Sequence, residues 1–323
     1  MTTARLARYR TVADTLAVRS DKQLVELLDA TPITRSGIGG TARVLDVDAV
    51  RVFAKRIPLT DVERAHPHST ANLFGLATHW QYGINSPGFG AWRELAANVI
   101  TTDAVLTGAS GAFPLLYHWR VLPGTQPAPT DPMHPALRPR LDAITNATAG
   151  IVLFLEHIPQ TLRAFLDAHG PDAADWLEER LHTDIPALNA TGLLHFDAHP
   201  GNILTDGERL YIADLGLATS PRFDLDADEA AFVDAHRDHD LGYAAMVLVN
   251  WLVSTVDGHT DAATRHARID AYAAGAPCDS PVIRRHAPAA AVMNAFYRRL
   301  FAGDHTAPYP QRELAAALGK PAG

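Results

Sequence analysis

The chain has 323 residues, with 36 acidic and 28 basic side chains, a formal net charge of -8 and a pI near 6.0. This length allows one two-lobed domain or two modest domains with a sizeable core. The acidic balance argues against a nucleic-acid-binding role for the surface as a whole, although a local basic patch stays open. The single Cys278 excludes an intrachain disulfide framework. No run of eighteen apolar residues occurs and the first ten residues lack the apolar stretch of a secretory signal, so we expect a cytoplasmic protein that does not bind membranes.

The N-terminal part of the chain predicts helices followed by a strand hairpin. Residues 4–30 carry apolar side chains at helical spacing, which indicates one or two helices. A glycine-rich turn follows at residues 36–41, and alternating apolar side chains then predict two strands that end near Ile57. Lys55 lies on the second strand, in a chain that uses arginine for most of its cations. A position that keeps lysine against this bias favours a compact ammonium over a planar guanidinium.

The middle of the chain is predicted as an insertion, a helix and two strands. Residues 58–88 show no clear strand and contain several prolines and asparagines, which indicates an insertion. A helix is expected over about 91–104, and strands over 113–122 and 151–155. Between these strands the proline-rich stretch 123–139 is predicted to be a loop.

The second half of the chain is predicted to be mainly helical. Helices are expected over 161–168 and 173–190, and Pro186 is expected to kink or shorten the second. Short apolar runs at 203–204 and 210–212 flank Asp206-Gly207 and predict a β-hairpin. An apolar helix is expected from about Asp240 to Val253, and further helices over 261–323.

The groups with the clearest chemical content lie at each end of that hairpin. Asp197 is followed five residues later by Asn202, and Asp214 comes twelve residues after Asn202, just before Leu-Gly. Phosphoryl transfer from ATP needs one group to orient the acceptor hydroxyl and take its proton, and two oxygen ligands for Mg²⁺. These three side chains supply such groups in that order.

These segments resemble the catalytic loop and magnesium motif of the protein-kinase-like superfamily, and the chain is similar to a bacterial protein kinase family member. The resemblance implies an α+β, bilobal protein-kinase-like fold. A small N-terminal lobe would hold an antiparallel sheet and one helix, and a larger C-terminal lobe would be mainly helical. The corresponding division is an N-terminal helical extension at 1–32, a nucleotide-binding lobe at 33–158 with the insertion 58–88, and a helical lobe with the catalytic loop at 159–323.

The same resemblance implies ATP and Mg²⁺ as cofactors and a role for each site residue. Asp197 and Lys55 would be catalytic, with Lys55 contacting the phosphates, and Asn202 and Asp214 would hold the metal. Glu94 would pair with Lys55, and Glu63 is the alternative because it lies nearer in sequence. The remaining nucleotide-binding residues would be those of the glycine loop and of the hinge that meets adenine: Gly37, Gly39, Gly40, Glu156 and Ile158.

The support residues and the acceptor also follow from the resemblance. Asp240 would bond to the backbone of the catalytic loop, and His195 would be structural. Phe196 stands where many regulated protein kinases carry arginine, and His199 stands where serine/threonine kinases carry lysine.

The leading interpretation is a kinase that acts on serine or threonine hydroxyls of a protein or peptide, favoured by Asp-Leu-Gly at 214–216 and by Asp240. A small-molecule kinase for an aminoglycoside, sugar or amino alcohol is the alternative, favoured by His-Pro-Gly-Asn at 199–202. A non-catalytic kinase-like binding module is the third.

Sixteen histidines also raise the question of a metal site. His236 and His239 lie three residues apart beside several aspartates, which can place two imidazoles on one helical face. Because no third ligand follows at a defined spacing, we favour a polar junction there over a metal site.

Overall fold

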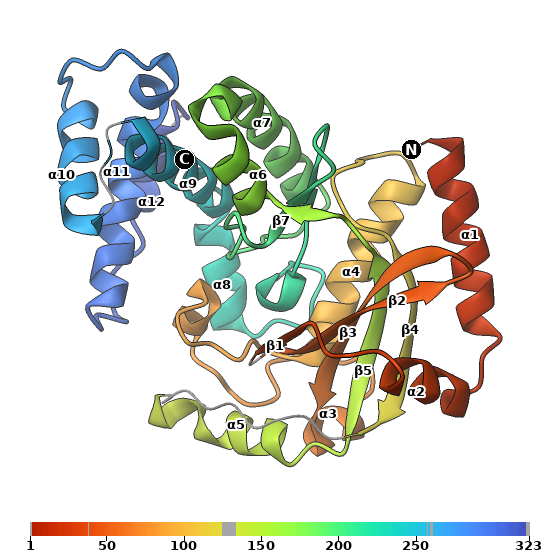
Figure 1. Ribbon diagram of the computed structural model, residues 1–323. Helices are drawn as coiled ribbons and strands as arrows, with labels where there is room; N and C mark the ends of the chain where they lie inside the picture. The colour runs from red at the N-terminus through yellow and green to blue at the C-terminus, as the bar shows by residue number, and fades with distance from the viewer. Residues whose placement is uncertain (1, 38, 125–133, 257, 259–260, 321–323) are drawn as a thin grey trace. The chain divides into compact units, whose positions relative to one another are not determined.

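The computed structural model describes residues 2–37, 39–124, 134–256, 258 and 261–320 (Figure 1). It belongs to the predicted mixed α+β class, with a small antiparallel sheet and a larger helical part. The chain forms two compact units: unit 1 comprises Met1–Ile158 and Asp214–Asp226, and unit 2 comprises Pro159–Ala213 and Ala227–Gly323. The sequence did not predict that the segment beginning at Asp214 would return to unit 1.

Unit 1 is built on a five-stranded antiparallel sheet with the order β1-β2-β3-β5-β4. Its strands are β1 (Arg35–Gly37), β2 (Gly40–Val47), β3 (Val50–Leu59), β4 (Leu116–Pro123) and β5 (Ala149–Glu156). Because side chains alternate along a strand, Lys55 points to the same face of β3 as Ile57 and Leu59. Lys55 pairs in register with Leu153 on β5, and Ile57 pairs with Ile151.

Unit 1 also contains helices. They are α1 (Thr3–Ala17), α2 (Asp21–Asp29), α3 (Asp61–Ala65), η1 (Thr78–Tyr82), α4 (Ala91–Leu106), η2 (Pro135–Leu137), α5 (Arg138–Thr145) and η4 (Leu215–Leu217). Trp92 and Leu95 of α4 pack on Ile57, Leu59 and Leu153, so α4 covers the face of the sheet that carries Lys55. α1 runs along β4 (Figure 1).

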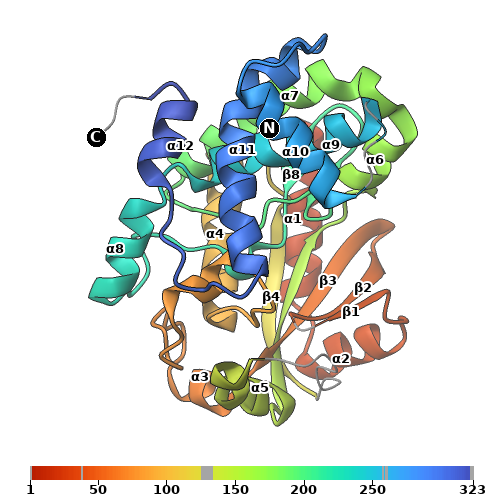
Figure 2. The same cartoon turned by 90° about the vertical axis from the view of Figure 1, so that its left-hand side faces the viewer.

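Two stretches of unit 1 hold helices that the sequence did not predict. The predicted insertion 58–88 contains α3 and η1, and β3 continues into it as far as Leu59. The predicted loop 123–139 ends in η2 and the start of α5, and its residues 125–133 lie outside the described part of the chain. α3 and α5 lie side by side at one end of the sheet (Figures 1 and 2), where Glu63 and Arg140 form a buried ion pair.

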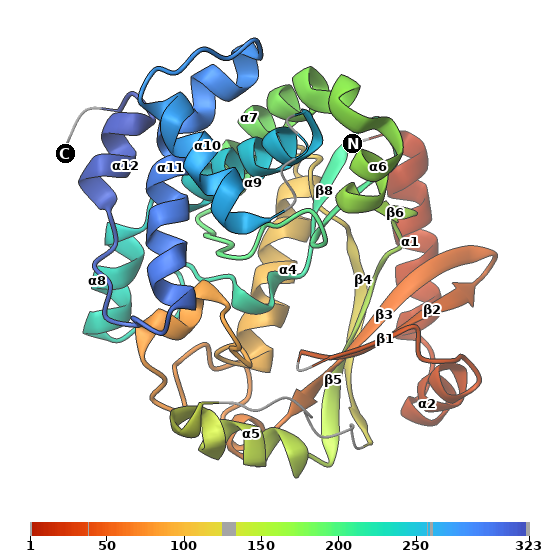
Figure 3. The same ribbon diagram turned by 60° about the vertical axis from the view of Figure 1, so that its left-hand side comes forward.

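Unit 2 combines a three-stranded sheet with helices. The strands, in the order β6-β7-β8, are β6 (Gln160–Thr161), β7 (Ile203–Thr205) and β8 (Leu210–Ile212). The helices are α6 (Leu162–His169), η3 (Gly170–Ala173), α7 (Ala174–Ala190), α8 (Ala227–Ala235), α9 (His239–Val256), α10 (Ala262–Ala273), α11 (Pro281–Phe301) and α12 (Gln311–Ala317). The apolar α9 packs against α7, α10 and α11 (Figure 3). The predicted hairpin is confirmed as β7–β8, and β6 and α8 were not predicted.

Pro186 does not shorten its helix, because α7 continues to Ala190; that it kinks the helix stays a prediction. A proline inside a helix removes one hydrogen bond to the carbonyl four residues back. Here that residue is His182, and the helix continues for four residues beyond the proline.

Within the described residues, no helix combines the length and the apolar character needed to cross a lipid bilayer.

A Gly40→Ala substitution is expected to lower the free energy of unfolding by about 1–3 kcal/mol. A Cβ at this position would lie 2.0 Å from the carbonyl oxygen of Arg56, and φ is +121°. Gly37→Ala is the matched control, because a Cβ there meets nothing within 4 Å. Urea denaturation followed by circular dichroism measures both, and equal effects of the two substitutions would contradict the account.

Candidate active site

The centre of the site in unit 1 is the ammonium group of Lys55. Its Nζ lies 2.6 Å from Oε1 of Glu94 on α4 and 2.7 Å from Oδ1 of Asp214. The side chains of Lys55 and Glu94 are only 13% and 6% exposed, whereas that of Asp214 is 35% exposed. We call these three residues the lysine cluster.

The lysine cluster holds its charges by mutual attraction. Burial alone would lower the pKa of Lys55, but the carboxylates of Asp214 and Glu94 outweigh burial and raise it. Burial raises the pKa of Glu94, and the Lys55 ammonium opposes that shift. The ammonium of Lys55 therefore stays protonated at neutral pH.

Of the two glutamates that the sequence offered as partners of Lys55, Glu94 forms the pair. Glu63 stabilises the fold instead. Its Oε2 accepts hydrogen bonds from the amide and the hydroxyl of Thr60 at 2.9 and 2.7 Å, which caps α3. Its Oε1 accepts from the amide of Ala91 at 2.8 Å and from Arg140 at 3.3 Å. One carboxylate thus accepts hydrogen bonds at the N-termini of both α3 and α4.

The turn that carries Asp214 packs closely on α4. Asp214 adopts φ +59°, in the left-handed region that is uncommon for residues other than glycine. At Gly216 a Cβ would lie 3.1 Å from Oε2 of Glu94, which explains a small residue there. The carbonyl of Leu217 accepts a hydrogen bond from Gln81 of η1. The predicted insertion therefore contacts the segment that carries Asp214.

The three predicted loop glycines have different surroundings. A Cβ on Gly39 would lie 3.9 Å from Nζ of Lys55, so the turn between β1 and β2 lies next to the ammonium. Gly40 is required by the close approach of Arg56 described above, and Gly37 faces open space. Ile38, within the predicted glycine loop, lies outside the described residues.

Glu156, predicted to lie in the hinge, uses its side chain to stabilise the fold. Its amide donates to the carbonyl of Leu115 at 2.8 Å, and its Oε2 accepts from the amide of Leu115 at 3.2 Å. Arg5 of α1 binds the carboxylate, with Nε at 3.1 and 3.0 Å and Nη2 at 2.6 Å. Ile158 is half-buried at the end of unit 1. A hinge contact with a ligand would therefore have to use backbone groups.

Sequence reasoning did not identify Arg5. Its guanidinium also donates to the carbonyls of Phe113 at 2.5 Å and Gly111 at 3.3 Å, and its side chain is 5% exposed. Arginine is seldom fully buried without a partner, but the burial of Arg5 is known only from the structure, so the sequence carried no local signal of this role.

In unit 2, Asp197 and Asn202 lie together. Nδ2 of Asn202 donates to Oδ2 of Asp197 at 2.8 Å and to its carbonyl at 3.0 Å. Asn202 is buried, and the Asp197 carboxylate is 31% exposed. Because the amide nitrogen of Asn202 is used in this way, its Oδ1 is the atom suited to bind a cation.

His199 lies in the same loop. Its Nδ1 accepts from the amide of Gly201 at 2.9 Å, and its Nε2 lies 3.9 Å from Oδ1 of Asp197. The imidazole is thus held by its own loop, beside the carboxylate.

Asp240 fixes the backbone of this loop. Its carboxylate accepts from the amides of His195 and Phe196 at 2.8 and 3.0 Å, and from Asn189 at 2.9 Å. Burial alone would raise the pKa of Asp240, but interactions with His239 and His195 hold it below its usual range. The backbone contact predicted for Asp240 is confirmed. With this support, the bulky Phe196 is held at φ +65°.

His195 is fully buried and ties the loop to the hairpin. Nε2 donates to the carbonyl of Ala213 at 2.9 Å, and Nδ1 accepts from the amide of Asp197 at 3.2 Å. Ala213 in turn donates its amide to the carbonyl of Asn202 at 3.0 Å, and Asp214 is the next residue. The structural role predicted for His195 fits these contacts.

The predicted junction at His236 and His239 is an aromatic cluster in unit 2. His236 stacks on Phe232 and Tyr309 with ring centroids 3.8 and 3.9 Å apart. His239 stacks on Phe196 at 4.4 Å, and its Nε2 lies 3.0 Å from the hydroxyl of Tyr297. Burial, together with the nearby His239, lowers the pKa of His236 to about 3. The two side chains thus pack against the Asp197 loop.

Arg5→Met is expected to cost about 3–5 kcal/mol in the free energy of unfolding, because it leaves the Glu156 carboxylate buried without its cation. Arg8→Met, an exposed arginine on the same helix, should change stability by less than about 0.5 kcal/mol. In a double-mutant cycle measured by urea denaturation, adding Glu156→Met to Arg5→Met should restore part of the loss. Additive losses would contradict the pairing.

The free energy of unfolding should depend on pH through His236. Its pKa is about 3 in the folded protein against 6.5 for an ordinary histidine, so the unfolded chain binds a proton first as the pH falls. The contribution of His236 to the free energy of unfolding is therefore fully present well above pH 6.5. It declines as the pH falls below 6.5, by at most about 1.4 kcal/mol per pH unit for one proton.

His236→Phe should flatten this decline in urea denaturation curves measured between pH 5 and 7. His66→Phe is the matched control. Nδ1 of His66 contacts the carbonyl of Val62, four residues back, as Nδ1 of His236 contacts that of Phe232, but His66 is exposed. The same flattening in both variants would exclude His236 as the cause.

Compared with known proteins, the chain matches no family model and no curated protein. Its function therefore has to be argued from the side chains described above.

Proposed function

We propose that the protein is an ATP- and magnesium-dependent phosphotransferase with a bilobal, protein-kinase-like fold, and that it phosphorylates a hydroxyl group. The observation that carries this proposal is the lysine cluster. Lys55 is held by Glu94 at 2.6 Å and Asp214 at 2.7 Å, next to a glycine turn. A fixed ammonium beside a partly exposed carboxylate suits a polyphosphate that arrives with a metal ion.

The donor groups fit Mg²⁺. This ion prefers oxygen ligands, keeps several waters and commonly takes one or two carboxylates together with phosphate oxygens. Asp214 would supply a carboxylate and Asn202 its amide oxygen. When bound, Mg²⁺ would neutralise phosphate charge. Lys55 would contact the phosphates, and Glu94 would keep the Lys55 ammonium in position.

Asp197 is assigned to the acceptor hydroxyl. Its carboxylate is partly exposed, and Asn202 fixes one oxygen at 2.8 Å. In this proposal Asp197 orients the hydroxyl and takes its proton as the phosphoryl group is transferred. Asp240 acts through the backbone of His195 and Phe196, so it is a positioning residue.

The acceptor that we favour is a serine or threonine hydroxyl of a protein or peptide, as Asp-Leu-Gly at 214–216 and the Asp240 contact indicate. One observation favours a small-molecule acceptor. His199, in place of a long lysine side chain, is held by the amide of Gly201 in its own loop. A non-catalytic binding module is disfavoured because Lys55, Asp197, Asn202 and Asp214 are all retained.

Lys55→Met and Asp197→Asn are expected to lower phosphate transfer from labelled ATP, the second by about 10²–10⁴-fold as for loss of a general base. Lys22→Met and Asp167→Asn are the matched controls, because both side chains are exposed, and they should retain activity. Purified protein is incubated with magnesium and either a cell extract or a panel of small hydroxyl compounds.

The fraction that carries the label identifies the acceptor class. Label in protein bands supports the serine/threonine kinase, and label in the small-molecule fraction supports the alternative. Nucleotide binding without any turnover by the unmodified chain would overturn the proposed phosphotransferase and favour a binding module.

A further inference from the structure

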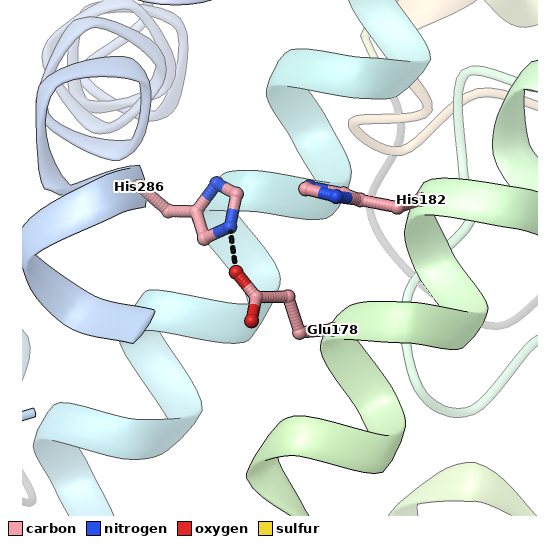
Figure 4. Close-up of side chains that lie close together, drawn as sticks. All are labelled: Glu178, His182 and His286. Atoms are coloured by element: carbon pink, nitrogen blue, oxygen red, sulfur yellow. Dashed lines mark hydrogen bonds and ion pairs between the residues drawn. The ribbon is translucent and has the colours of Figure 1, made fainter. Parts of the chain in front are cut away.

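Three side chains of metal-binding type meet on two helices of unit 2. Glu178 and His182 lie one turn apart on α7, and His286 lies on α11 (Figure 4). Each offers a ligand atom, and these atoms all lie within 4.8 Å of one another. In Figure 4 the two imidazoles approach from opposite helices, with the Glu178 carboxylate beside His286. Among the described residues this is the one such group of three or more.

Helix geometry explains why these side chains meet. Residues four apart on a helix share a face, so Glu178 and His182 both turn toward α11, which packs on α7. The rings of His182 and His286 lie 4.9 Å apart at 78°, and Nε2 of His286 lies 2.6 Å from Oε1 of Glu178. The side chains of Glu178 and His286 are 12% and 10% exposed, whereas His182 is exposed.

Two of the three groups are in the form that binds metals. Burial, partly offset by Glu178, lowers the pKa of His286, so its imidazole is neutral at neutral pH. Burial alone would raise the pKa of Glu178, but hydrogen bonds from His286 and Arg285 hold it below its usual range. Neutral imidazole and ionised carboxylate are the forms that ligate a transition metal.

We propose that Glu178, His182 and His286 form a binding site for Zn²⁺, with a fourth position open to solvent. Two imidazoles and one carboxylate are a common set of three protein ligands for zinc, and imidazole disfavours Mg²⁺ and Ca²⁺. The site is independent of the proposed phosphotransferase activity.

The change needed to admit the ion is small. Zinc bonds of about 2.0–2.2 Å in tetrahedral geometry place ligand atoms about 3.3 Å apart. The exposed His182 ring can turn inward to close the present separation. The proton on Nε2 of His286 moves to Nδ1 by exchange with solvent, which frees Nε2 for the ion and leaves the imidazole neutral. Arg285, which contacts the same carboxylate and is 56% exposed, can extend into water as the cation enters.

An occupied site would join α7 to α11. Because the ion would bind only the folded chain, zinc is expected to raise the melting temperature of the protein. α7 also leads into the segment that carries His195 and Asp197.

The test is a titration of the full chain with Zn²⁺, and with Co²⁺ as a spectroscopic probe, in the absence of nucleotide. We expect one ion to bind per chain, visible Co²⁺ bands of a nitrogen- and oxygen-ligated ion, and a rise in melting temperature. His182→Ala should weaken binding by more than about 100-fold, since losing even a residue that orients a ligand costs 10–100-fold. His182 is exposed, so this variant is expected to fold.

Two controls make the result specific. His169→Ala removes an exposed histidine from α6 and should leave Zn²⁺ affinity unchanged. Asp214→Asn should also retain it, which separates this site from the proposed magnesium site. The inference is overturned if the unmodified chain shows no Zn²⁺ binding, if His182→Ala binds as tightly as the unmodified chain, or if Asp214→Asn abolishes binding.

Discussion

The buried ammonium of Lys55 is the interaction on which the candidate site depends. Glu94 and Asp214 together place two carboxylates around one cation, so the lysine cluster carries a net negative charge when both are ionised. Removing either carboxylate partner from a buried ammonium is costly, because it leaves a buried charge without compensation. Asp214 is the most exposed member of the lysine cluster, so in the proposed reaction it would be the carboxylate that turns to a metal ion while Glu94 keeps Lys55 in position.

A second carboxylate, that of Asp240, has a comparable role in unit 2. It accepts hydrogen bonds from two successive backbone amides and from Asn189, and so it defines the path of the chain just before Asp197. This explains how an aromatic residue, Phe196, is kept in a left-handed conformation. Its ring stacks with those of Phe232 and His239, which offsets the cost of the backbone. Backbone and side-chain contacts thus fix the same residue.

The parts of the molecule that were predictable from sequence depend on local patterns. Alternating apolar side chains predicted the strand that carries Lys55, and the Asp206-Gly207 turn identified the β7–β8 hairpin. The contact between Arg5 and Glu156 was not predictable, because the two residues lie 151 positions apart and no periodicity links them. The zinc ligands were missed for the same reason, since His286 belongs to a different helix from Glu178 and His182.

The ion pair between Arg5 and Glu156 limits how freely the first helix can be replaced. The first 32 residues looked like an extension beside a nucleotide-binding region, yet α1 supplies the cation that neutralises the end of β5. Loss or exchange of this helix, by recombination or by trimming, would require a simultaneous change at Glu156. We therefore expect positions 5 and 156 to change together wherever the first helix is replaced.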